Sequence, residues 1–156
     1  MKFLELKCPP PIVLIVSSLM AWLVSQRSWE FVLQQCNALD NLLWPLAFVI
    51  AGTALALAGL KEFADQQTTV NPLDPNLSSC LVTSGVFQLT RNPMYLGMLL
   101  VSLGWADLLD HFMAYLGALI FFTYISVFQI TPEESIMEEK FGETFNQYRR
   151  SVRRWL

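Results

Sequence analysis

The stretch Leu42–Leu60, LLWPLAFVIAGTALALAGL, is nineteen residues long and carries no charged side chain. An α-helix needs about 20 predominantly apolar residues, within a range of about 17–25, to cross the hydrocarbon core of a membrane. Three further apolar blocks lie at Ile12–Ser25, Met94–Leu109 and Phe112–Ile130. The chain is 54% hydrophobic and 15% charged, with a mean hydropathy of +0.42. This composition argues against an ordinary soluble protein and indicates an integral membrane protein.

The blocks predict an all-α integral membrane protein with about four transmembrane helices, at about residues 9–25, 42–60, 93–109 and 111–130. At 156 residues the chain is expected to form a single domain, residues 1–156. The first block is long enough only if Pro9–Pro11 begin its helix, and Asp107 interrupts the third. Gly52 and Ala56 lie one helical turn apart, a spacing that allows close helix packing. Such faces serve contacts within and between chains equally well, so they predict no oligomeric state.

The basic residues favour one orientation in the membrane. With four spans and both termini in the cytoplasm, Arg27 lies outside, in the connection Gln26–Asn41, and nine basic residues lie inside. These nine are Lys2, Lys7, Lys61, Arg91, Lys140, Arg149, Arg150, Arg153 and Arg154. We therefore expect a multi-pass protein of the cytoplasmic membrane, the inner membrane if the source is prokaryotic. No small-x-small cleavage site follows Val24, which favours an uncleaved signal-anchor over a signal peptide.

The polar sequence gathers in two cytoplasmic regions, residues 61–92 and 131–156. The first contains Pro72 and Pro75, which exclude a helix there, and it is expected to be disordered or folded over a site. In the second, apolar residues spaced by three and four predict one apolar stripe on an amphipathic helix at the membrane surface. The stripe consists of Met137, Phe141, Phe145, Tyr148, Val152 and Trp155. Because the polar residues collect on one side of the membrane, the protein is expected to act there.

The cysteines and the single histidine predict neither a metal site nor a disulfide framework. Cys8, Cys36 and Cys80 are odd in number and show no CxxC spacing. His111 stands between the third and fourth apolar blocks, where its expected role is that of a polar anchor at the membrane interface. We therefore expect no bound metal.

The tripeptide Arg91-Asn92-Pro93 precedes the third apolar block. Asn is a favoured N-cap and Pro is favoured at the first helical position, so a helix is predicted to begin here. Gly85, a few residues upstream, suits a close turn. A glycine turn before a helix N-terminus offers N–H groups to an anionic ligand. A helix start by itself accounts for neither Arg91 nor Tyr95.

A second polar cluster, Thr131-Pro132-Glu133-Glu134, follows the fourth block. Thr131 and Glu134 have capping-box spacing with Pro132 at the first helical position, which predicts that a new helix begins here. Glu133 has no part in that cap. Its carboxylate is expected to be either solvated or bound to a cation, and the residues alone favour solvation.

Several motifs recur in one order over the second half of the chain, from Leu81 to Leu156. They are a glycine turn, the helix start R-x-P-x-Y-x-G, another span, the pair Glu133-Glu134, Phe141-Gly142, an aromatic residue with Tyr148, and a basic end. This half resembles the isoprenylcysteine carboxyl methyltransferase family, in particular its short prokaryotic members, and shares the pattern with membrane phospholipid N-methyltransferases. The resemblance implies a membrane enzyme that binds S-adenosylmethionine on the cytoplasmic side. It further implies methyl transfer to a lipophilic acceptor, first of all the carboxyl group of an isoprenylcysteine-like substrate.

The resemblance also implies roles for individual residues. The cofactor-binding positions are Leu81, Val82, Phe87, Asn92, Pro93, Met94, Tyr95 and Glu133. Catalytic roles fall to Arg91, Glu134 and Tyr148, and substrate contacts to Gln129 and Arg149. A carboxylate acceptor needs no general base, which fits a sequence without a Ser-His-Asp or Cys-His arrangement. An amine acceptor must first lose a proton, and Glu134 or Tyr148 would then be the candidate base.

Three positions depart from the family pattern and keep alternatives open. Ser79 or its neighbour stands in place of a second histidine in the loop. Asn92 stands in place of a common histidine, and Gln129 in place of a substrate-facing arginine, whose charge Arg91, Arg149 or Arg150 could supply. The alternatives are a phospholipid or amine N-methyltransferase and a non-catalytic membrane scaffold that keeps the fold. The expected partners are the lipid bilayer and a lipophilic small-molecule or prenylated substrate, with no nucleic acid.

Overall fold

In the computed structural model, residues 5–36, 39–67 and 79–156 are described. Their regular secondary structure is helical, as predicted. The helices are α1 (Pro10–Ser25), α2 (Trp29–Cys36), α3 (Leu39–Asp65), α4 (Pro93–Leu108), α5 (Tyr115–Tyr124) and α6 (Thr131–Ser151), with the short elements η3 (Gly85–Gln88), η4 (Phe112–Ala114) and η5 (Ile125–Ile130). The predicted loop around Pro72 and Pro75 lies outside the described residues.

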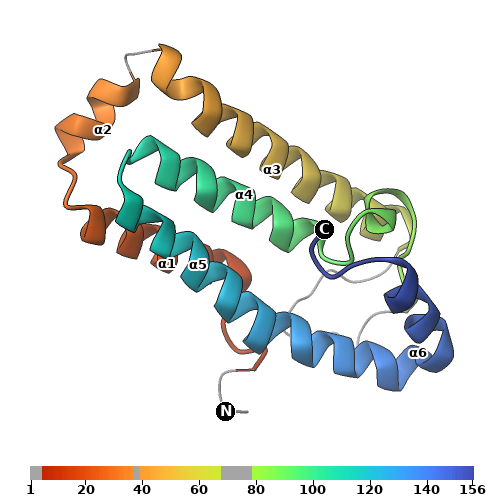
Figure 1. The fold of residues 1–156 in the computed structure, drawn as a ribbon. Helices are drawn as coiled ribbons and strands as arrows, with labels where there is room; N and C mark the ends of the chain where they lie inside the picture. Colours follow the sequence, from red (N-terminus) through yellow and green to blue (C-terminus); the bar gives the residue numbers. More distant parts are fainter. Residues whose placement is uncertain (1–4, 37–38, 68–78) are drawn as a thin grey trace.

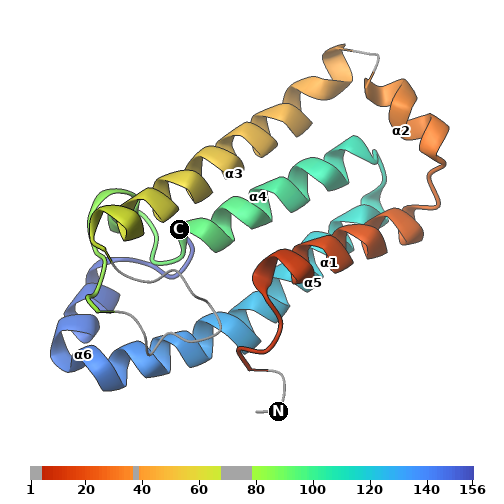
Figure 2. The same ribbon diagram turned by 180° about the vertical axis from the view of Figure 1, so that it is seen from behind.

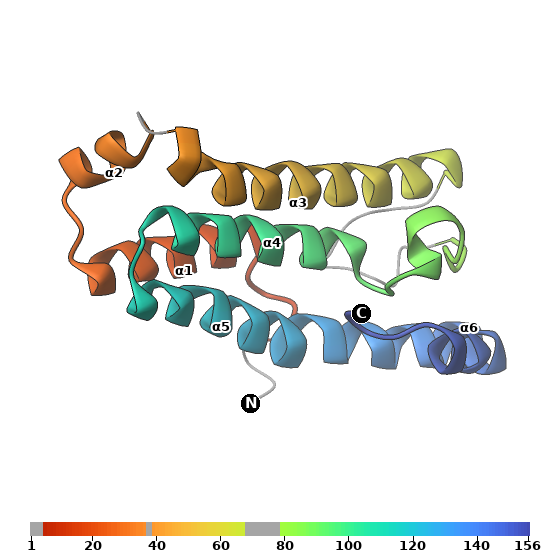
Figure 3. The ribbon, with the colours of Figure 1, turned by 45° about the horizontal axis from the view of Figure 1, so that its top comes forward.

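The long helices α1, α3, α4 and α5 run side by side (Figures 1 and 3). Helix α3 packs against α4, and α4 packs in turn against α1 and α5. Figure 2 shows the opposite side, where α1 lies against α5. Helix α6 continues α5 beyond the start of α4, and the C-terminus returns to that start (Figure 1). One end of the bundle is therefore enclosed by the end of α3, the start of α4 and α6.

Small residues set the distance between α3 and α4. A Cβ atom on Gly52 would overlap the carbonyl oxygen of Gly97, and a Cβ on Gly97 would overlap that of Gly52. The Cβ of Ala56 would lie 3.0 Å from the one added at Gly97. The predicted close approach through Gly52 and Ala56 is confirmed, because only small side chains let the two backbones come this near.

Among the described residues, two helices are long and apolar enough to cross a membrane, Asn41–Asp65 and Phe112–Ser151, the latter through its apolar first half. Helices α1 and α2 pass the same test only together, as a pair bent by 102°. Helix α4 has 16 residues, which span about 24 Å against a hydrocarbon core of about 30 Å. Helices thus lie at all four predicted positions, whereas the number of spans and their orientation stay predictions.

The segment after α1 contains a helix that the sequence had suggested to be only a connection. Ser28 Oγ accepts a hydrogen bond from the Phe31 N–H at 3.2 Å, at the start of α2. Just before it, Arg27 donates to the carbonyl oxygens of Leu109 at 3.2 Å and of Asp110 at 2.8 Å. A cation at a helix C-terminus satisfies carbonyls that lack a partner in the helix. This contact ties the bend after α1 to the far end of α4.

The prediction that a capped helix begins at Thr131 is wrong. The backbone is helical on both sides, and α5, the π-helical segment η5 and α6 form one continuous helix. Pro132 has no N–H to donate to the carbonyl of Phe128, and that oxygen instead accepts from the N–H of Leu6 at 3.1 Å. The Thr131 hydroxyl donates to the Ser126 carbonyl at 2.8 Å. A π-turn thus absorbs the proline inside the helix, and Glu134 is free for another role.

The prediction that one helix carries the apolar stripe as far as Trp155 is also wrong beyond Gly142. That residue has a φ of 53° and a ψ of −124°, so α6 bends there. The helix ends at Ser151, and Val152 is extended. Glycine tolerates this conformation, which would strain other residues. The bend turns the second half of α6 back toward the start of α4.

Candidate functional site

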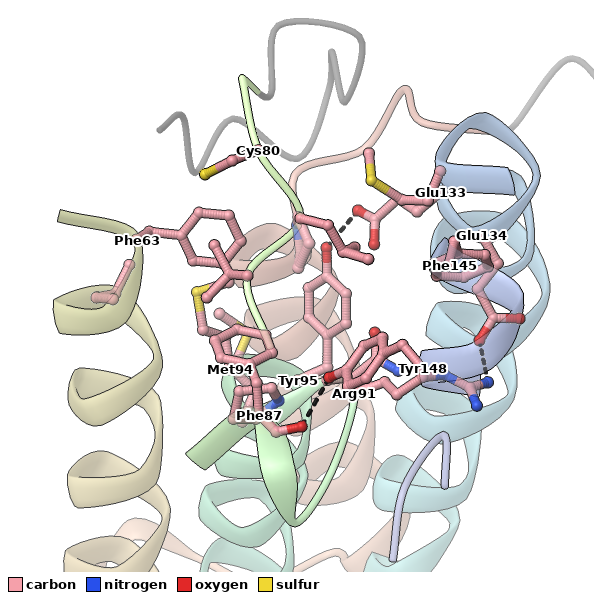
Figure 4. A pocket seen from close by; sticks show the side chains of 18 of the residues that line it. Phe63, Cys80, Phe87, Arg91, Met94, Tyr95, Glu133, Glu134, Phe145 and Tyr148 are labelled. Atoms are coloured by element: carbon pink, nitrogen blue, oxygen red, sulfur yellow. Dashed lines mark hydrogen bonds and ion pairs between the residues drawn. The ribbon is translucent and has the colours of Figure 1, made fainter. Parts of the chain in front are cut away.

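A cavity of ≈ 380 Å³ lies at the end of the bundle where α3 ends, α4 begins and α6 passes by (Figure 4). This volume falls in the range of small-molecule sites, about 300–1,000 Å³. The cavity is lined by Pro10 and Pro11 of α1, Leu60 and Phe63 of α3, Cys80, Leu81, Val82, Phe87, Arg91 and Asn92 before α4, Pro93, Met94, Tyr95 and Met98 of α4, and Glu133, Glu134, Met137, Phe145 and Tyr148 of α6. All the predicted cofactor-binding and catalytic residues therefore line this one cavity. The fold brings them together from distant parts of the chain.

The wall beside α3 is the segment that contains η3. Val82 and Phe87 are each 5% exposed, and Gly85 has a φ of +55°, which favours glycine. The ring of Phe63 meets that of Phe87 edge to face, with their centres 5.5 Å apart. The close turn predicted at Gly85 is confirmed, and it presents an apolar, partly aromatic surface to the cavity.

Glu133 reaches the cavity from the first turn of α6, beyond the apolar segment that ends at Ile130 (Figure 4). The Tyr95 hydroxyl donates to its Oε1 at 2.6 Å, and the Gln129 amide donates to the same atom at 2.7 Å. Burial raises the pKa of Glu133 to about 7, although both hydrogen bonds act to lower it. Within the described part of the chain, no Lys or Arg forms an ion pair with it. The carboxylate is thus not simply solvated; it has neutral partners and faces a cavity that could hold a cationic group.

Glu134 joins two arginines instead of capping a helix. Arg91 Nη2 lies 2.5 Å from Oε1 of Glu134, and Arg154 binds Oε2 and also donates from Nε to Oε1 at 3.1 Å. Burial acts to raise the pKa of Glu134, but the hydrogen bonds and charges of Arg154 and Arg91 hold it below the ordinary value. An ionised carboxylate held by two cations is poorly suited to accept a proton.

The Arg91 side chain is fixed from several sides and is only 10% exposed. Its Nη1 donates to the carbonyls of Val152 at 2.7 Å and of Arg149 at 3.0 Å. Its Nε is buried and has no hydrogen-bond partner among the described residues. A buried donor without a partner is unusual, and an anionic group near Arg91 would satisfy it.

The last residues of the chain complete this wall. The carbonyl of Arg154 accepts from Thr90 Oγ1 at 3.2 Å and from Asn92 Nδ2 at 2.9 Å, and the carbonyl of Arg153 accepts from the Arg91 N–H at 3.0 Å. The ring of Trp155 lies 5.0 Å from that of Phe122. Helix α4 begins at Pro93 as predicted, but the Asn92 side chain does not cap it, because it binds the tail.

Tyr148 lies on the bent half of α6, and its hydroxyl donates to the Phe87 carbonyl at 2.7 Å (Figure 4). Burial raises the pKa of Tyr148, with a smaller opposing effect of the Arg91 charge. Its hydroxyl is therefore held protonated and supports the η3 segment.

Two predicted substrate residues lie outside the cavity wall. Gln129 is 1% exposed and binds Glu133. Arg149 is 49% exposed in its side chain and pairs with Glu138 at 3.5 Å. In the structure Gln129 therefore contacts Glu133, and Arg149 lies on the surface.

Sequence reasoning missed several residues that line the cavity or support its wall. Phe63, Leu60 and Cys80 flank the loop, and Arg154 completes the ion pairs of Glu134. The apolar stripe of the tail was the signal for two more, because Met137 and Phe145 face the cavity. Nothing in the spacing of Phe63 or Arg154 pointed to the site, since their contacts depend on the path of the chain.

Comparisons with known proteins show which family the chain resembles in sequence. Residues 41–144 match the phospholipid methyltransferase family. An uncharacterized protein of Haemophilus influenzae is 46% identical over 63 residues, which are 40% of this chain and 100% of that protein. The protein-S-isoprenylcysteine O-methyltransferase of Schizosaccharomyces pombe is 29% identical over 108 residues, which are 69% of this chain and 45% of the yeast protein.

No solved structure matches the chain. The family match begins at Asn41 and includes α3, the η3 segment, α4, and Glu133 and Glu134 of α6. It therefore contains most of the cavity wall described above. This chain belongs to the phospholipid methyltransferase family, a family of membrane methyltransferases, as the ordered motifs of its second half predicted.

Proposed function

We propose that this protein transfers the methyl group of S-adenosylmethionine to a lipophilic acceptor at the membrane surface. Methyltransferases of its family use this cofactor. The observation that carries the proposal is the Glu133 carboxylate, which faces the cavity and, among the described residues, accepts from the neutral donors Tyr95 and Gln129. A carboxylate in such surroundings is suited to bind a cationic group.

The chemistry of the lining residues fits the cofactor. Glu133 would bind its ammonium group, and Arg91, with an unsatisfied Nε, would attract its carboxylate. The apolar surface formed by Phe63, Phe87 and Met94 would hold its aromatic base. Because positive and negative side chains stand in the same wall, the cavity suits a zwitterion better than a simple anion or cation.

The chemical demands on the protein are then mainly those of positioning. The cofactor supplies an electrophilic methyl group on a sulfonium, so the side chains need only hold the reactants and exclude water. Glu134 and Arg154 fix the direction of Arg91, and Tyr148 fixes the backbone of Phe87. Arg91 is the residue that would bind or orient a reacting group directly.

A carboxyl group, as in an isoprenylcysteine-like substrate, is our first candidate for the acceptor. The similarity to the fission yeast protein, a protein-S-isoprenylcysteine O-methyltransferase by name, supports it. A carboxylate is already nucleophilic, so it needs no general base. This chain spans only 45% of the yeast protein, so the acceptor of the yeast protein is proposed for this chain and not carried over to it as a finding.

An amine lipid is the second candidate, favoured by the surroundings of Glu133. A pKa of about 7 lets this carboxylate accept a proton near neutral pH, which an amine acceptor must lose. In this case Glu133, in place of Glu134 or Tyr148, is the proposed base, and a different group would bind the ammonium of the cofactor.

We also propose that the cavity faces the cytoplasm. Arg27 lies at the end of α4 away from Pro93, whereas Arg91 and Arg154 lie at the cavity end. This distribution supports the orientation expected from the positive-inside rule.

Titration of the purified protein with S-adenosylhomocysteine tests the proposal. We expect saturable binding, measured by calorimetry in detergent or nanodiscs. No heat of binding at millimolar ligand would overturn the enzymatic proposal and favour the non-catalytic scaffold.

The acceptor is tested with cofactor that carries a labelled methyl group. Prenylcysteine analogues and amine lipids are offered in separate reactions, and the labelled product is treated with mild base. Label released by base indicates a methyl ester, whereas label that resists base indicates N-methylation.

A further inference from the structure

The η3 segment, residues 80–88, is hydrogen-bonded to the end of α3 through side chains that lie one helical turn apart on that helix. Ser84 Oγ donates to Oε2 of Glu62 at 2.5 Å, and Gln66 Nε2 donates to Ser84 Oγ at 2.9 Å. The Cys80 thiol lies 3.4 Å from Oε1 of Gln66, in hydrogen-bonding geometry. Glu62 and Gln66 share one face of α3, since residues four apart are neighbours on a helix. They therefore hold the chain at two residues, Cys80 and Ser84.

The absence of a side chain at Gly85 leaves room for the Glu62 carboxylate. A Cβ atom at Gly85 would overlap Oε1 and the carboxyl carbon of Glu62. The φ of +55° at Gly85 also favours glycine. The carboxylate thus lies directly over the turn, in space that any other residue at position 85 would fill.

The fastened segment carries one wall of the cavity. Leu81, Val82 and Phe87 line it, and Phe63, next to Glu62 in α3, touches the Phe87 ring. On the opposite side the Tyr148 hydroxyl holds the Phe87 carbonyl. Helix α3 therefore holds the turn at Ser84 and Gly85, and α6 holds its end.

We infer that Glu62 is a positioning residue for cofactor binding, which acts through Ser84 and the Gly85 turn. Glu62 does not line the cavity, so its effect passes through the segment it holds. The inference rests on the proposed use of S-adenosylmethionine. Without the carboxylate, Ser84 loses its acceptor, and the wall formed by Leu81, Val82 and Phe87 loses its attachment to α3.

The first test measures S-adenosylhomocysteine affinity in matched variants. Glu62→Ala is expected to weaken binding at least tenfold, whereas Glu62→Gln stays within about threefold, because its amide oxygen still accepts from Ser84 Oγ. Asp65→Ala, which removes an exposed acid from the same end of α3, is expected to change nothing. Equal affinity of the wild type and Glu62→Ala would overturn the inference.

Steady-state kinetics distinguish positioning from a general folding defect. In Glu62→Ala the KM for S-adenosylmethionine is expected to rise about as much as the dissociation constant, with kcat at saturating cofactor within about twofold. A fall in kcat at an unchanged KM would contradict positioning, because it would indicate a loss of correctly folded protein.

A cofactor-free measurement reports on the segment itself. In a background with Cys8→Ser and Cys36→Ser, the half-buried Cys80 is the remaining thiol. Its rate of labelling by a maleimide is expected to rise at least threefold in Glu62→Ala and to stay unchanged in Asp65→Ala. An unchanged rate in Glu62→Ala would overturn the inference even if no cofactor binds.

A double-mutant cycle tests the contact between the two residues. Gly85→Ala alone must displace the carboxylate and strain the backbone, whereas in the Glu62→Ala background only the strain remains. The fold-loss in affinity caused by Gly85→Ala is therefore expected to be smaller in that background. If the wild type itself fails to bind S-adenosylhomocysteine, the proposed function fails, while the labelling result still decides the role of Glu62 in the structure.

Discussion

The hydroxyl of Tyr95 donates a hydrogen bond of 2.6 Å to Oε1 of Glu133, which joins the first turn of α4 to the first turn of α6. The Gln129 amide binds the same oxygen from the preceding turn of its own helix. These two neutral donors orient the carboxylate toward the cavity, and no Lys or Arg of residues 5–36, 39–67 and 79–156 forms an ion pair with it. The first two predictions rest on this arrangement.

Glu133→Gln is expected to weaken S-adenosylhomocysteine binding about 10- to 100-fold. The substitution keeps the shape of the side chain and removes its charge, and a hydrogen bond to a charged group contributes about 1.5–3 kcal/mol. Tyr95→Phe removes one orienting donor and is expected to weaken binding less, about threefold to tenfold. Calorimetric titration checks both, with Glu139→Gln on the exposed part of α6 as control. A Glu133→Gln variant that binds like the wild type would contradict the role given to this carboxylate.

Binding of S-adenosylhomocysteine is expected to strengthen as the pH rises through about 7. The pKa of Glu133 is raised to about 7, so below this pH the carboxyl group is protonated and loses its attraction for an ammonium group. Above it the carboxylate is charged, and the affinity reaches a plateau. Titrations from about pH 5.5 to 8.5 measure the slope, which should reach at most about tenfold per unit below the pKa. The slope should be absent in Glu133→Gln; a slope of the same size in that variant would assign it to another group.

Glu134→Ala is expected to lower the free energy of unfolding by about 2 kcal/mol. The loss lies between the small value of an exposed ion pair and the about 3–5 kcal/mol of a fully buried one, because the Glu134 side chain is 13% exposed. Without it, Arg91 and Arg154 repel each other with no acid between them. Reversible denaturation in mixed micelles measures the change. Glu143→Ala is the matched control, since its pair with Arg150 is 64% and 76% exposed and should matter little.

Arg154→Ala is expected to weaken S-adenosylhomocysteine binding severalfold, although Arg154 does not line the cavity. Its guanidinium orients Glu134, which in turn orients Arg91, and charge-assisted bonds of this kind are the stronger class of hydrogen bond. Arg153→Ala is the control, because the exposed Arg153 contributes its backbone carbonyl and not its side chain to the contact with Arg91. If both variants bind the ligand equally well, the side chain of Arg154 has no part in the site.

Gly52→Leu is expected to destabilise the bundle by about 2–3 kcal/mol, whereas Ala54→Leu on the same helix is expected to have little effect. A side chain at Gly52 meets the backbone of Gly97, and overpacking of this kind forces neighbouring helices apart. Ala54 is exposed on the outer face of α3, where a larger apolar side chain meets lipid. Unfolding midpoints in the same detergent decide between the two. Equal destabilisation by both would mean that the contact of α3 with α4 does not limit stability.

Local sequence patterns predicted the positions of the helices and most of the wall. Apolar blocks have few stable forms in a membrane other than a helix, which is why the helices lie where the blocks lie. The order of motifs from Leu81 onward predicted the family and brought Arg91, Tyr95 and Glu133 forward as site residues. These features depend on residue type and spacing, and both can be read along the chain.

The same local rules failed where a distant group changed the outcome. Asn92 and Thr131 look like helix caps, yet Asn92 binds the tail, and a π-turn carries the helix through Thr131. Because Pro132 has no N–H, the Phe128 carbonyl accepts a hydrogen bond from the N–H of Leu6 instead, more than a hundred residues away in the sequence. A local pattern cannot show that a backbone group is satisfied from elsewhere.

The sequence by itself determined a helical membrane protein of a methyltransferase family, with its polar residues collected at one end. Only the tertiary structure decided which of those residues act together. It showed that Glu134 forms ion pairs with Arg91 and Arg154. It also showed that Gln129 donates a hydrogen bond to Glu133, and that Glu62 accepts one from Ser84 beside the turn at Gly85. Apolar blocks are recognised from neighbours along the chain, whereas a buried charge is stabilised by whichever partner the fold brings to it.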